Sequence, residues 1–487
     1  RIDNASAPMH FPMHLSLTEL ASLIAWPLGG PQIAGLPPSV ARHIPPAEHI
    51  PRSGGRPFGL SNYPGRERPV SVAFVDLLTH CWWIGSTGAG KTTALANGLK
   101  ADVEAGHGIF LLEAKGDLFR QALDYIPPER EQDVIVLDLS NAHRAVGLNL
   151  MDQGNPDRTI DAMTRFFEDM YGGGRGVWSR AVFYNGLKVI AANNGCGILD
   201  LGPLLDPQND SQKAWRDQAI ANCRDADVRA WFKSHDEKPE AKRLQVVTPV
   251  LDRIWEFGKP KLRAVLGQSH SAFQFSDVVK NNKILLVNLA GVEPAAAEML
   301  GALIFDGYWA AVQDETNKPK LPNFGYYDEF QRFVRMQADF ADVLATSRSK
   351  LWGHTMANQY RDQLPDHLLD ALSRNAATQV VFRADGKEAA AFANEFGGLV
   401  SKEDFETLPP RTAIAKFATN GASTPAFTLT TLPPATPYRN STRIIGDSLS
   451  KYGKYAAEVD AEINARRQAE TPATGKGDER FRLAGDW

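Results

Sequence analysis

Short apolar runs alternate with helical patterns in two parts of the chain, residues 71–152 and 276–433. Several of these runs end in polar residues, as buried strands do when their carboxyl ends border a ligand crevice. The alternation predicts an α/β fold with a mostly parallel sheet. The expected strands are 68–74, 78–84, 108–117, 134–138, 283–289, 323–330, 351–357, 377–383, 413–417 and 427–432, and the expected helices are 93–104, 118–125, 295–312 and 340–347.

The alternation stops between residues 153 and 275, where the apolar residues follow helical spacing. We therefore predict an all-α domain inserted into the sheet domain, whose two parts are residues 71–152 and 276–433. Aromatic stripes at this spacing predict a helical core rather than a ligand site. The stripes are Ile160, Met163, Phe166, Phe167 and Met170, followed by Ala181, Phe183, Leu187 and Ile190.

The two ends of the chain lack a core pattern of their own. Residues 1–70 contain a short helical pattern at 16–25 and a stretch rich in proline and glycine from 27 to 65. We expect this segment to wrap along a surface. Residues 434–487 are predicted to form one charged helix over 447–468 and then a flexible tail.

The composition adds limits rather than a function. With 53 basic and 57 acidic residues the net charge is −4, so any DNA contact has to come from a local patch or a channel. The three cysteines are odd in number and widely spaced, which fits a reducing cytoplasm. The apolar stretch 20–36 is interrupted by prolines and glycines, so it does not read as a membrane span.

One motif indicates nucleotide binding. Residues 85–92 fit G-x-x-x-x-G-K-[ST], between an expected strand and an expected helix. In such a loop, successive N–H groups and the helix N-terminus face a phosphate. Lys91 is expected to reach the β- and γ-phosphates of ATP, and the Thr92 hydroxyl to bind Mg²⁺. The predicted nucleotide-binding residues are Gly85, Ser86, Thr87, Gly88, Ala89, Gly90, Lys91, Thr92 and Thr93.

Hydrolysis also needs a carboxylate near the metal and a base for the attacking water. Asp328 and Glu329 end an apolar run, and we predict Asp328 as the Mg²⁺-side acid and Glu329 as the base. Gln359 ends the next expected strand and is predicted to sense the γ-phosphate. An arginine from a neighbouring subunit would complete such a site, with Arg348 preferred over Arg374 and Arg383.

These segments together resemble the motifs of type IV secretion coupling proteins of the TraG/TraD class. The resemblance covers about His80 to Leu432 and includes the long insertion. Its motifs are the phosphate loop with the preceding His80, Glu-Ala-Lys-Gly-Asp-Leu at 113–118, Gly-Leu-Asn-Leu at 147–150, Tyr-Asp-Glu-Phe at 327–330, Ser-Arg-Ser-Lys at 347–350 and Asn-Gln at 358–359.

Two of these motifs depart from the family pattern. Glu113 and Ala114 stand where the family has Asp-Pro, and Asn149-Leu150 lacks the proline of the Asn-Pro-Leu segment. The first departure leaves the role of that strand end open. Neither departure touches the loop or the acidic pair.

The resemblance implies a RecA-like P-loop ATPase of the FtsK/HerA superfamily, hexameric when active, with a monomer as the alternative for an isolated fragment. The implied partners are a DNA or relaxase-type nucleoprotein substrate and the components of a type IV secretion channel. The family carries an N-terminal membrane anchor, and the chain begins at Arg1. We therefore expect the cytoplasmic portion of an inner-membrane-anchored protein.

Two alternatives to a DNA translocase stay open at this point. One is a secretion ATPase that energises channel assembly or protein export without DNA. The other is a scaffold that binds ATP with negligible turnover and docks substrates through residues 153–275. The presence of Lys91, Thr92, Asp328 and Glu329 together argues against the scaffold.

Overall fold

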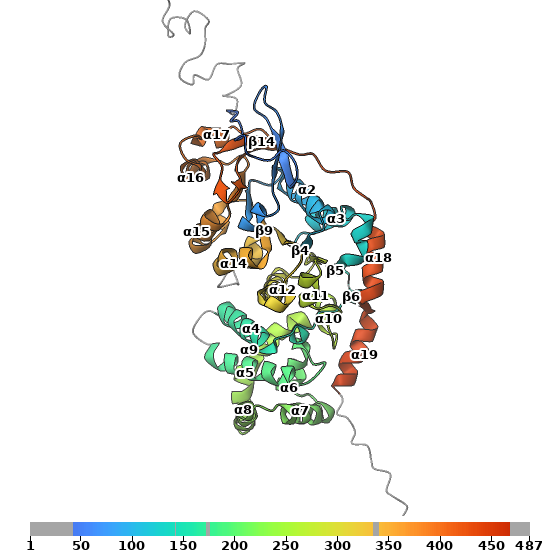
Figure 1. Cartoon of the computed structure of the whole chain (residues 1–487). Helices are drawn as coiled ribbons and strands as arrows, with labels where there is room; N and C mark the ends of the chain where they lie inside the picture. The colour runs from blue at the N-terminus through green and yellow to red at the C-terminus, as the bar shows by residue number, and fades with distance from the viewer. Residues whose placement is uncertain (1–41, 142, 172–175, 335–339, 468–487) are drawn as a thin grey trace, which may run out of the picture.

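The computed structural model describes residues 42–141, 143–171, 176–334 and 340–467. The helical pattern at 16–25 and the apolar stretch 20–36 lie outside these ranges. An 11-stranded sheet with the order β2-β1-β14-β11-β10-β3-β9-β8-β4-β7-β5 forms the upper part of the molecule, and helices of the insertion form the lower part (Figure 1).

Seven neighbouring strands of the sheet are parallel, as the sequence pattern predicts. Nearly every residue in them is buried, because helices cover both faces and leave no polar side for water. These strands are β10 (Thr378–Val381), β3 (Cys81–Ile84), β9 (Trp352–Asn358), β8 (Asn323–Asp328), β4 (Gly108–Glu113), β7 (Ile284–Asn288) and β5 (Val134–Asp138).

Alternate residues of each parallel strand belong to different cores, because successive side chains point to opposite faces. In β4, Ile109 packs into the core that contains residues of α2 (Lys91–Glu104) and α3 (Asp117–Asp124). Phe110 packs into the other core and stacks on Tyr308 of α12 (Pro294–Gln313). The apolar runs in the sequence thus serve two cores at once.

The helix α12 is the one helix among the described residues with the length and apolar composition of a membrane span. In the structure, 72% of its most apolar window is buried within the protein.

The remaining four strands are antiparallel: β11 (Thr412–Lys416), β14 (Phe427–Thr431), β1 (Arg56–Ser61) and β2 (Pro69–Val72). The prediction that residues 1–70 only wrap along a surface is wrong for β1, which lies inside the sheet between β14 and β2. Pro57 and Gly59 conceal this strand in the sequence. Gly59 is needed there, since a Cβ would lie 2.3 Å from the Thr430 carbonyl oxygen.

Arg56 shows why this short strand holds. Its buried Nε donates to Asp102 Oδ1 of α2 at 2.9 Å. The guanidinium Cζ lies 4.8 Å from the centroid of the Phe324 ring. Tyr326 of β8 donates its hydroxyl to the same carboxylate at 2.6 Å. The antiparallel edge is therefore tied to the central strands through one buried ion pair.

The described part of residues 153–275 contains helices and no strand. Two of its predicted stripes meet, because Phe167 stacks on Phe183 with ring centroids 4.4 Å apart. Ile160, Met163 and Leu187 are buried in the same core. The side chains of Phe166 and Met170 lie outside the described residues. The helices of this region are α4 (Pro156–Tyr171), α5 (Gly176–Ala191), α6 (Leu201–Leu205), α7 (Asp210–Asn222), α8 (Ala226–Asp236), α9 (Glu240–Phe257), α10 (Pro260–Leu266) and, at its end, α11 (Phe275–Lys280).

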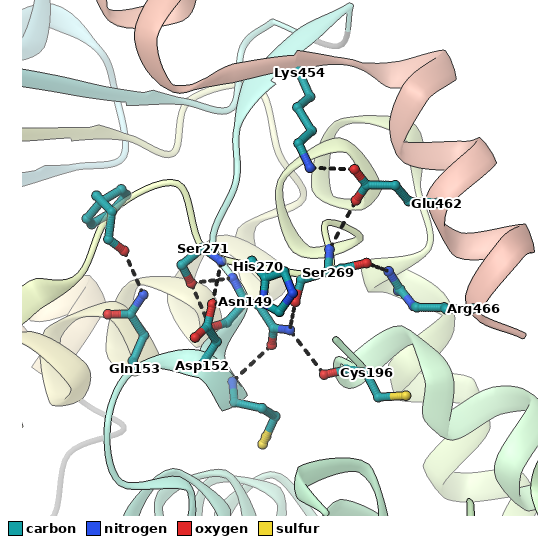
Figure 2. A network of polar contacts seen from close by, with 12 residues as sticks. Asn149, Asp152, Gln153, Cys196, Ser269, His270, Ser271, Lys454, Glu462 and Arg466 are labelled. Atoms are coloured by element: carbon teal, nitrogen blue, oxygen red, sulfur yellow. Dashed lines mark hydrogen bonds and ion pairs between the residues drawn. The ribbon is translucent and has the colours of Figure 1, made fainter. Parts of the chain in front are cut away.

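Asn149 joins the two places where the chain leaves and re-enters the sheet domain (Figure 2). Its side-chain Nδ2 donates to the carbonyl oxygens of Cys196 and Ser269 at 3.0 and 2.8 Å. Its Oδ1 accepts the Met151 N–H at 3.0 Å. The asparagine of this family-like motif thus fixes the crossing to the insertion, without the proline of the family pattern.

The C-terminal part of the chain differs from the predicted single helix over 447–468. It forms α18 (Ser441–Tyr452), the short strand β15 (Gly453–Tyr455) and α19 (Ala456–Arg466). Gly453 is extended and lets β15 pair with β6 (Arg144–Val146), which interrupts the helix. We call residues 441–467 the C-terminal strap, because it runs from the sheet to the insertion along one side of the molecule (Figure 1).

The strap is fixed at both of its ends. At the sheet, the Ser448 hydroxyl accepts the N–H of Val136 in the edge strand β5 at 2.9 Å. At the insertion, Arg466 Nε and Arg467 Nε donate to the two oxygens of Asp200 at 2.9 and 2.7 Å. The Asp200 side chain is fully buried.

Candidate nucleotide-binding site

The predicted phosphate loop connects β3 to the N-terminus of α2. Gly88 and Gly90 have φ of 82° and 107°, values that glycine adopts without strain and that turn the backbone N–H groups inward. Lys91 begins α2, and its Nζ donates to the carbonyl oxygens of Gly85 and Ser86, the latter at 3.0 Å. Burial lowers the pKa of Lys91, while Asp328 and Glu329 oppose that shift. The lysine is thus held beside two carboxylates.

The strand order explains how distant segments meet the loop. β3, β9, β8 and β4 are consecutive neighbours, and their carboxyl ends lie along one edge of the sheet. That edge carries in turn the loop after β3, Gln359 after β9, Asp328 and Glu329 at the end of β8, and Lys115 after β4. The structure therefore brings together the predicted loop, the acidic pair and the glutamine.

Thr92 and Asp328 provide a fit for a hard cation. The Thr92 hydroxyl donates to Asp328 Oδ2 at 2.9 Å, so two oxygen ligands converge at the N-terminus of α2. Hydroxyl, carboxylate and phosphate oxygens are the ligands that Mg²⁺ prefers. Burial raises the pKa of Asp328, and the Thr92 hydrogen bond and Lys91 oppose the shift.

Glu329 is held by three donors. Its Oε1 accepts from Lys115 Nζ and from Gln359 Nε2, the latter at 2.6 Å, and its Oε2 lies 3.2 Å from Arg332 Nε. Burial would raise the pKa of this carboxyl, but the hydrogen bonds from Lys115 and Gln359 outweigh it and the pKa lies below its usual value. With φ of 56°, Glu329 has a strained backbone, which is found at functional sites.

The residues 113–118 have two roles that motif matching did not assign. Glu113 accepts the N–H groups of Asp117, Leu118 and Phe119, the last at 2.6 Å, so it caps the N-terminus of α3. This answers the open question about the Glu113-Ala114 departure. Lys115 contacts Glu329 directly, because β4 lies beside β8 in the sheet.

The arginine candidates are spread over the domain. Arg348 is exposed in the turn at Ser347–Lys350, which precedes β9 at the amino ends of the strands, away from its own phosphate loop. Arg374 is exposed at the end of α15 (Asp366–Asn375), and Arg383 follows β10. The role of Arg348 in a neighbouring subunit's site stays a prediction.

Arg411 is a further arginine that no motif indicated. Its Cγ lies 3.9 Å from the position that a Cβ on Gly90 would take, and its side chain is exposed. It precedes β11, so only the pairing of the antiparallel strands brings it beside the loop.

His80 lies at the other end of β3 and is buried. Its Nε2 bonds to the Leu344 carbonyl oxygen at 2.8 Å, and its Nδ1 accepts the backbone N–H of His354 at 3.2 Å. Burial lowers the pKa of His80 to about 4, the Leu344 bond opposes this, and the charge of Arg348 lowers it further. The histidine of the family-like motif is thus a neutral structural residue that anchors β3.

This environment predicts that acid weakens the fold between about pH 6.5 and pH 4. The unfolded state binds a proton at His80 near pH 6.5, and the folded state binds it only near pH 4. Stability contributed by the neutral imidazole is therefore lost as the pH falls from 6.5 towards 4, by on the order of 3 kcal/mol. Urea unfolding at several pH values measures this loss. The variant His80→Asn should show a shallower dependence over that window, and an unchanged slope would contradict the assignment.

A scan against protein-family models and a search of curated proteins both found no match for the sequence. The comparison with solved structures found matches over most of the chain. The unbound form of the bacterial conjugative coupling protein TrwB, lacking its first 70 residues, is 14% identical and covers 84% of this chain and 97% of its own, with a TM-score of 0.56. The chain has the fold of TrwB.

Two further structures share this fold. TrwB in complex with ADP and Mg²⁺ is 15% identical, with a TM-score of 0.56 over 76% of this chain and 88% of that one. VirB4 of Thermoanaerobacter pseudethanolicus is 12% identical, with a TM-score of 0.53 over 80% of this chain and 99% of that one. At such identities the likeness to TrwB establishes the RecA-like fold, and the chemistry rests on this chain's own residues.

Proposed function

We propose that this chain is a Mg²⁺-dependent ATPase that drives DNA or nucleoprotein into a type IV secretion or conjugation channel. The observation that carries the ATPase is the convergence of Thr92, Asp328 and Glu329 beside the phosphate loop. The TrwB fold supports the transport role, since TrwB is a conjugative coupling protein.

The loop and its flanking residues would hold the nucleotide. Backbone N–H groups of residues 85–91 and the N-terminus of α2 face the phosphates, and Lys91 exchanges its present bonds to Gly85 and Ser86 for the β- and γ-phosphate oxygens. Thr92 and Asp328 would hold Mg²⁺, which would supply charge neutralisation at the phosphates.

In hydrolysis, Glu329, Gln359 and a trans arginine would each have a separate role. Glu329 accepts the proton of a water molecule whose oxygen forms the new bond to the γ-phosphorus, while the bond to the β–γ bridging oxygen breaks. Gln359 donates to Glu329 at 2.6 Å and fixes the direction of that carboxylate. A trans arginine, with Arg348 as the predicted residue, would stabilise the charge on the transferred group in a ring of subunits.

The partners follow from the proposed class. The net charge of −4 gives no basic field over the whole chain, so DNA would contact a local patch or the channel of a homo-hexamer. The channel components would be those of a type IV secretion system. In the cell the chain would act as the cytoplasmic portion of an inner-membrane-anchored protein.

The test is the ATPase rate with and without single- and double-stranded DNA, over a series of protein concentrations. We expect the turnover per subunit to rise with protein concentration, because a neighbouring subunit completes the site. We also expect DNA to stimulate it. Turnover that DNA leaves unchanged would favour a secretion ATPase without DNA. Absence of turnover at every concentration, with ATP still bound, would favour the scaffold and refute the proposed enzyme.

A further inference from the structure

Lys115 is a second lysine at the phosphate site. It lies two residues beyond the end of β4, beside the acidic end of β8, and it contacts Glu329 Oε1. Burial lowers the pKa of Lys91, and the charge of Lys115 lowers it further. The two ammonium groups are therefore close enough to repel each other. A bound polyphosphate would reduce that repulsion.

The contacts of Glu329 leave little room for a substrate water. Oε1 accepts two donors, Lys115 and Gln359, and Oε2 faces Arg332 at 3.2 Å. A carboxylate offers about four acceptor positions, so three of them are in use here. Both acceptor positions of Oε1 are in use, so a water molecule that gives its proton to that oxygen has to compete with Lys115 or Gln359.

Of the three donors, Lys115 is the one that can most readily move from Glu329 to a phosphate. Its side chain is 44% exposed, whereas that of Glu329 is 7% exposed and fixed at the end of a buried strand. Gln359 carries no charge, so a phosphate attracts its amide less strongly than it attracts an ammonium group. Arg332 is nearly as exposed, at 40%, but it faces Oε2, so its movement would not free Oε1. A flexible ammonium is a point-charge binder of phosphate.

We propose that Lys115 couples the γ-phosphate to Glu329: without nucleotide it holds the carboxylate, and with ATP it transfers to the γ-phosphate and releases Oε1 for the attacking water. This inference rests on the proposed ATPase function. The transfer exchanges hydrogen bonds only, and no covalent bond forms or breaks. With ADP, which has no γ-phosphate, Lys115 stays on Glu329, so the base is freed only when there is a phosphoryl group to attack. Lys115 is thus a sensor and positioning residue.

The first experiment measures equilibrium binding of ADP and of a non-hydrolysable ATP analogue to the whole chain with Mg²⁺. Lys115→Met keeps an unbranched side chain of similar length and removes the charged amino group. It should weaken binding of the analogue by about tenfold or more and leave ADP binding within about twofold. Lys115→Arg should keep most of the preference for the analogue. Equal weakening for both nucleotides, or no weakening, would overturn the sensor role.

The second experiment asks whether Lys115 acts through Glu329. Because the analogue has to draw Lys115 away from the carboxylate, Glu329→Gln should bind the analogue several-fold more tightly than the wild type. That gain should disappear in the double variant Lys115→Met with Glu329→Gln. A gain that persists in the double variant would contradict the exchange.

Lys402→Met is the matched control, since Lys402 is also 44% exposed and also pairs with a glutamate, Glu406, but in α17 (Lys402–Glu406) away from the site. It should change neither affinity. If the wild type binds no nucleotide at all, the proposed function fails. If it binds both nucleotides and Lys115→Met matches it, only the sensor role fails.

Discussion

Glu329→Gln is expected to lower the ATPase kcat by about 10²–10⁴-fold while ATP still binds, because a general base contributes that much to hydrolysis. The substitution keeps the shape of the side chain and one acceptor oxygen, so Gln359 retains a partner. What it removes is the group that accepts the proton of the attacking water. Lys91, Thr92 and Asp328 are untouched, which is why nucleotide affinity should survive.

The measurement pairs steady-state turnover with equilibrium binding of ATP. Glu406→Gln serves as the control, because Glu406 is a surface glutamate that accepts the Gly386 N–H and pairs with Lys402. It should leave kcat within about twofold. A Glu329→Gln protein that keeps more than half of the wild-type turnover would remove Glu329 from the proposed mechanism and return that role to another group.

Asp200→Ala is expected to lower the free energy of unfolding by about 3–5 kcal/mol, the cost of leaving buried charges without their partner. The Asp200 carboxylate is fully buried and binds both Arg466 and Arg467. It also accepts the Gly197 N–H at 2.9 Å. Its removal leaves two guanidinium groups, 10% and 19% exposed, without a counter-charge.

Urea unfolding followed by circular dichroism measures the change, with Asp460→Ala as the comparison. Asp460 lies on the same strap and pairs with Arg263 at 2.5 Å, but its side chain is 53% exposed. An exposed pair contributes less than about 1 kcal/mol, so the two aspartates should differ clearly. Similar small effects for both would mean that the strap is held by its apolar contacts instead.

The parallel part of the sheet could be predicted because its strands are buried on both faces and so appear as continuous apolar runs. β1 could not, since Pro57 and Gly59 break the pattern and the strand forms only when β14 and β2 lie on either side of it. The predicted helix over 447–468 failed for a similar reason. Its helical spacing is genuine, but the pairing of Gly453 with Val146 interrupts it.

In the site, the loop and the acidic pair could be predicted because each is contiguous in the sequence and each residue type has a distinct chemical task. Lys115, Arg332 and Arg411 could not be assigned in this way. Lys115 and Arg411 reach the site through the order of the strands, and sequence distance does not reveal that β4 is the neighbour of β8. Arg332 lies close in sequence, but a lone arginine after an acidic pair carries no signal.

The two ends of the 11-stranded sheet limit how copies of this chain can assemble. At one end, β2 is four residues long and begins with Pro69, which has no N–H to offer. At the other, the strap covers the edge strand β5 and takes up the Val136 N–H through Ser448. Short strands, proline and covered edges all prevent a sheet from pairing with another chain. A ring of subunits would therefore be built from side-chain and loop contacts, whose geometry can change with the bound nucleotide, and not from a sheet continued rigidly from one subunit to the next.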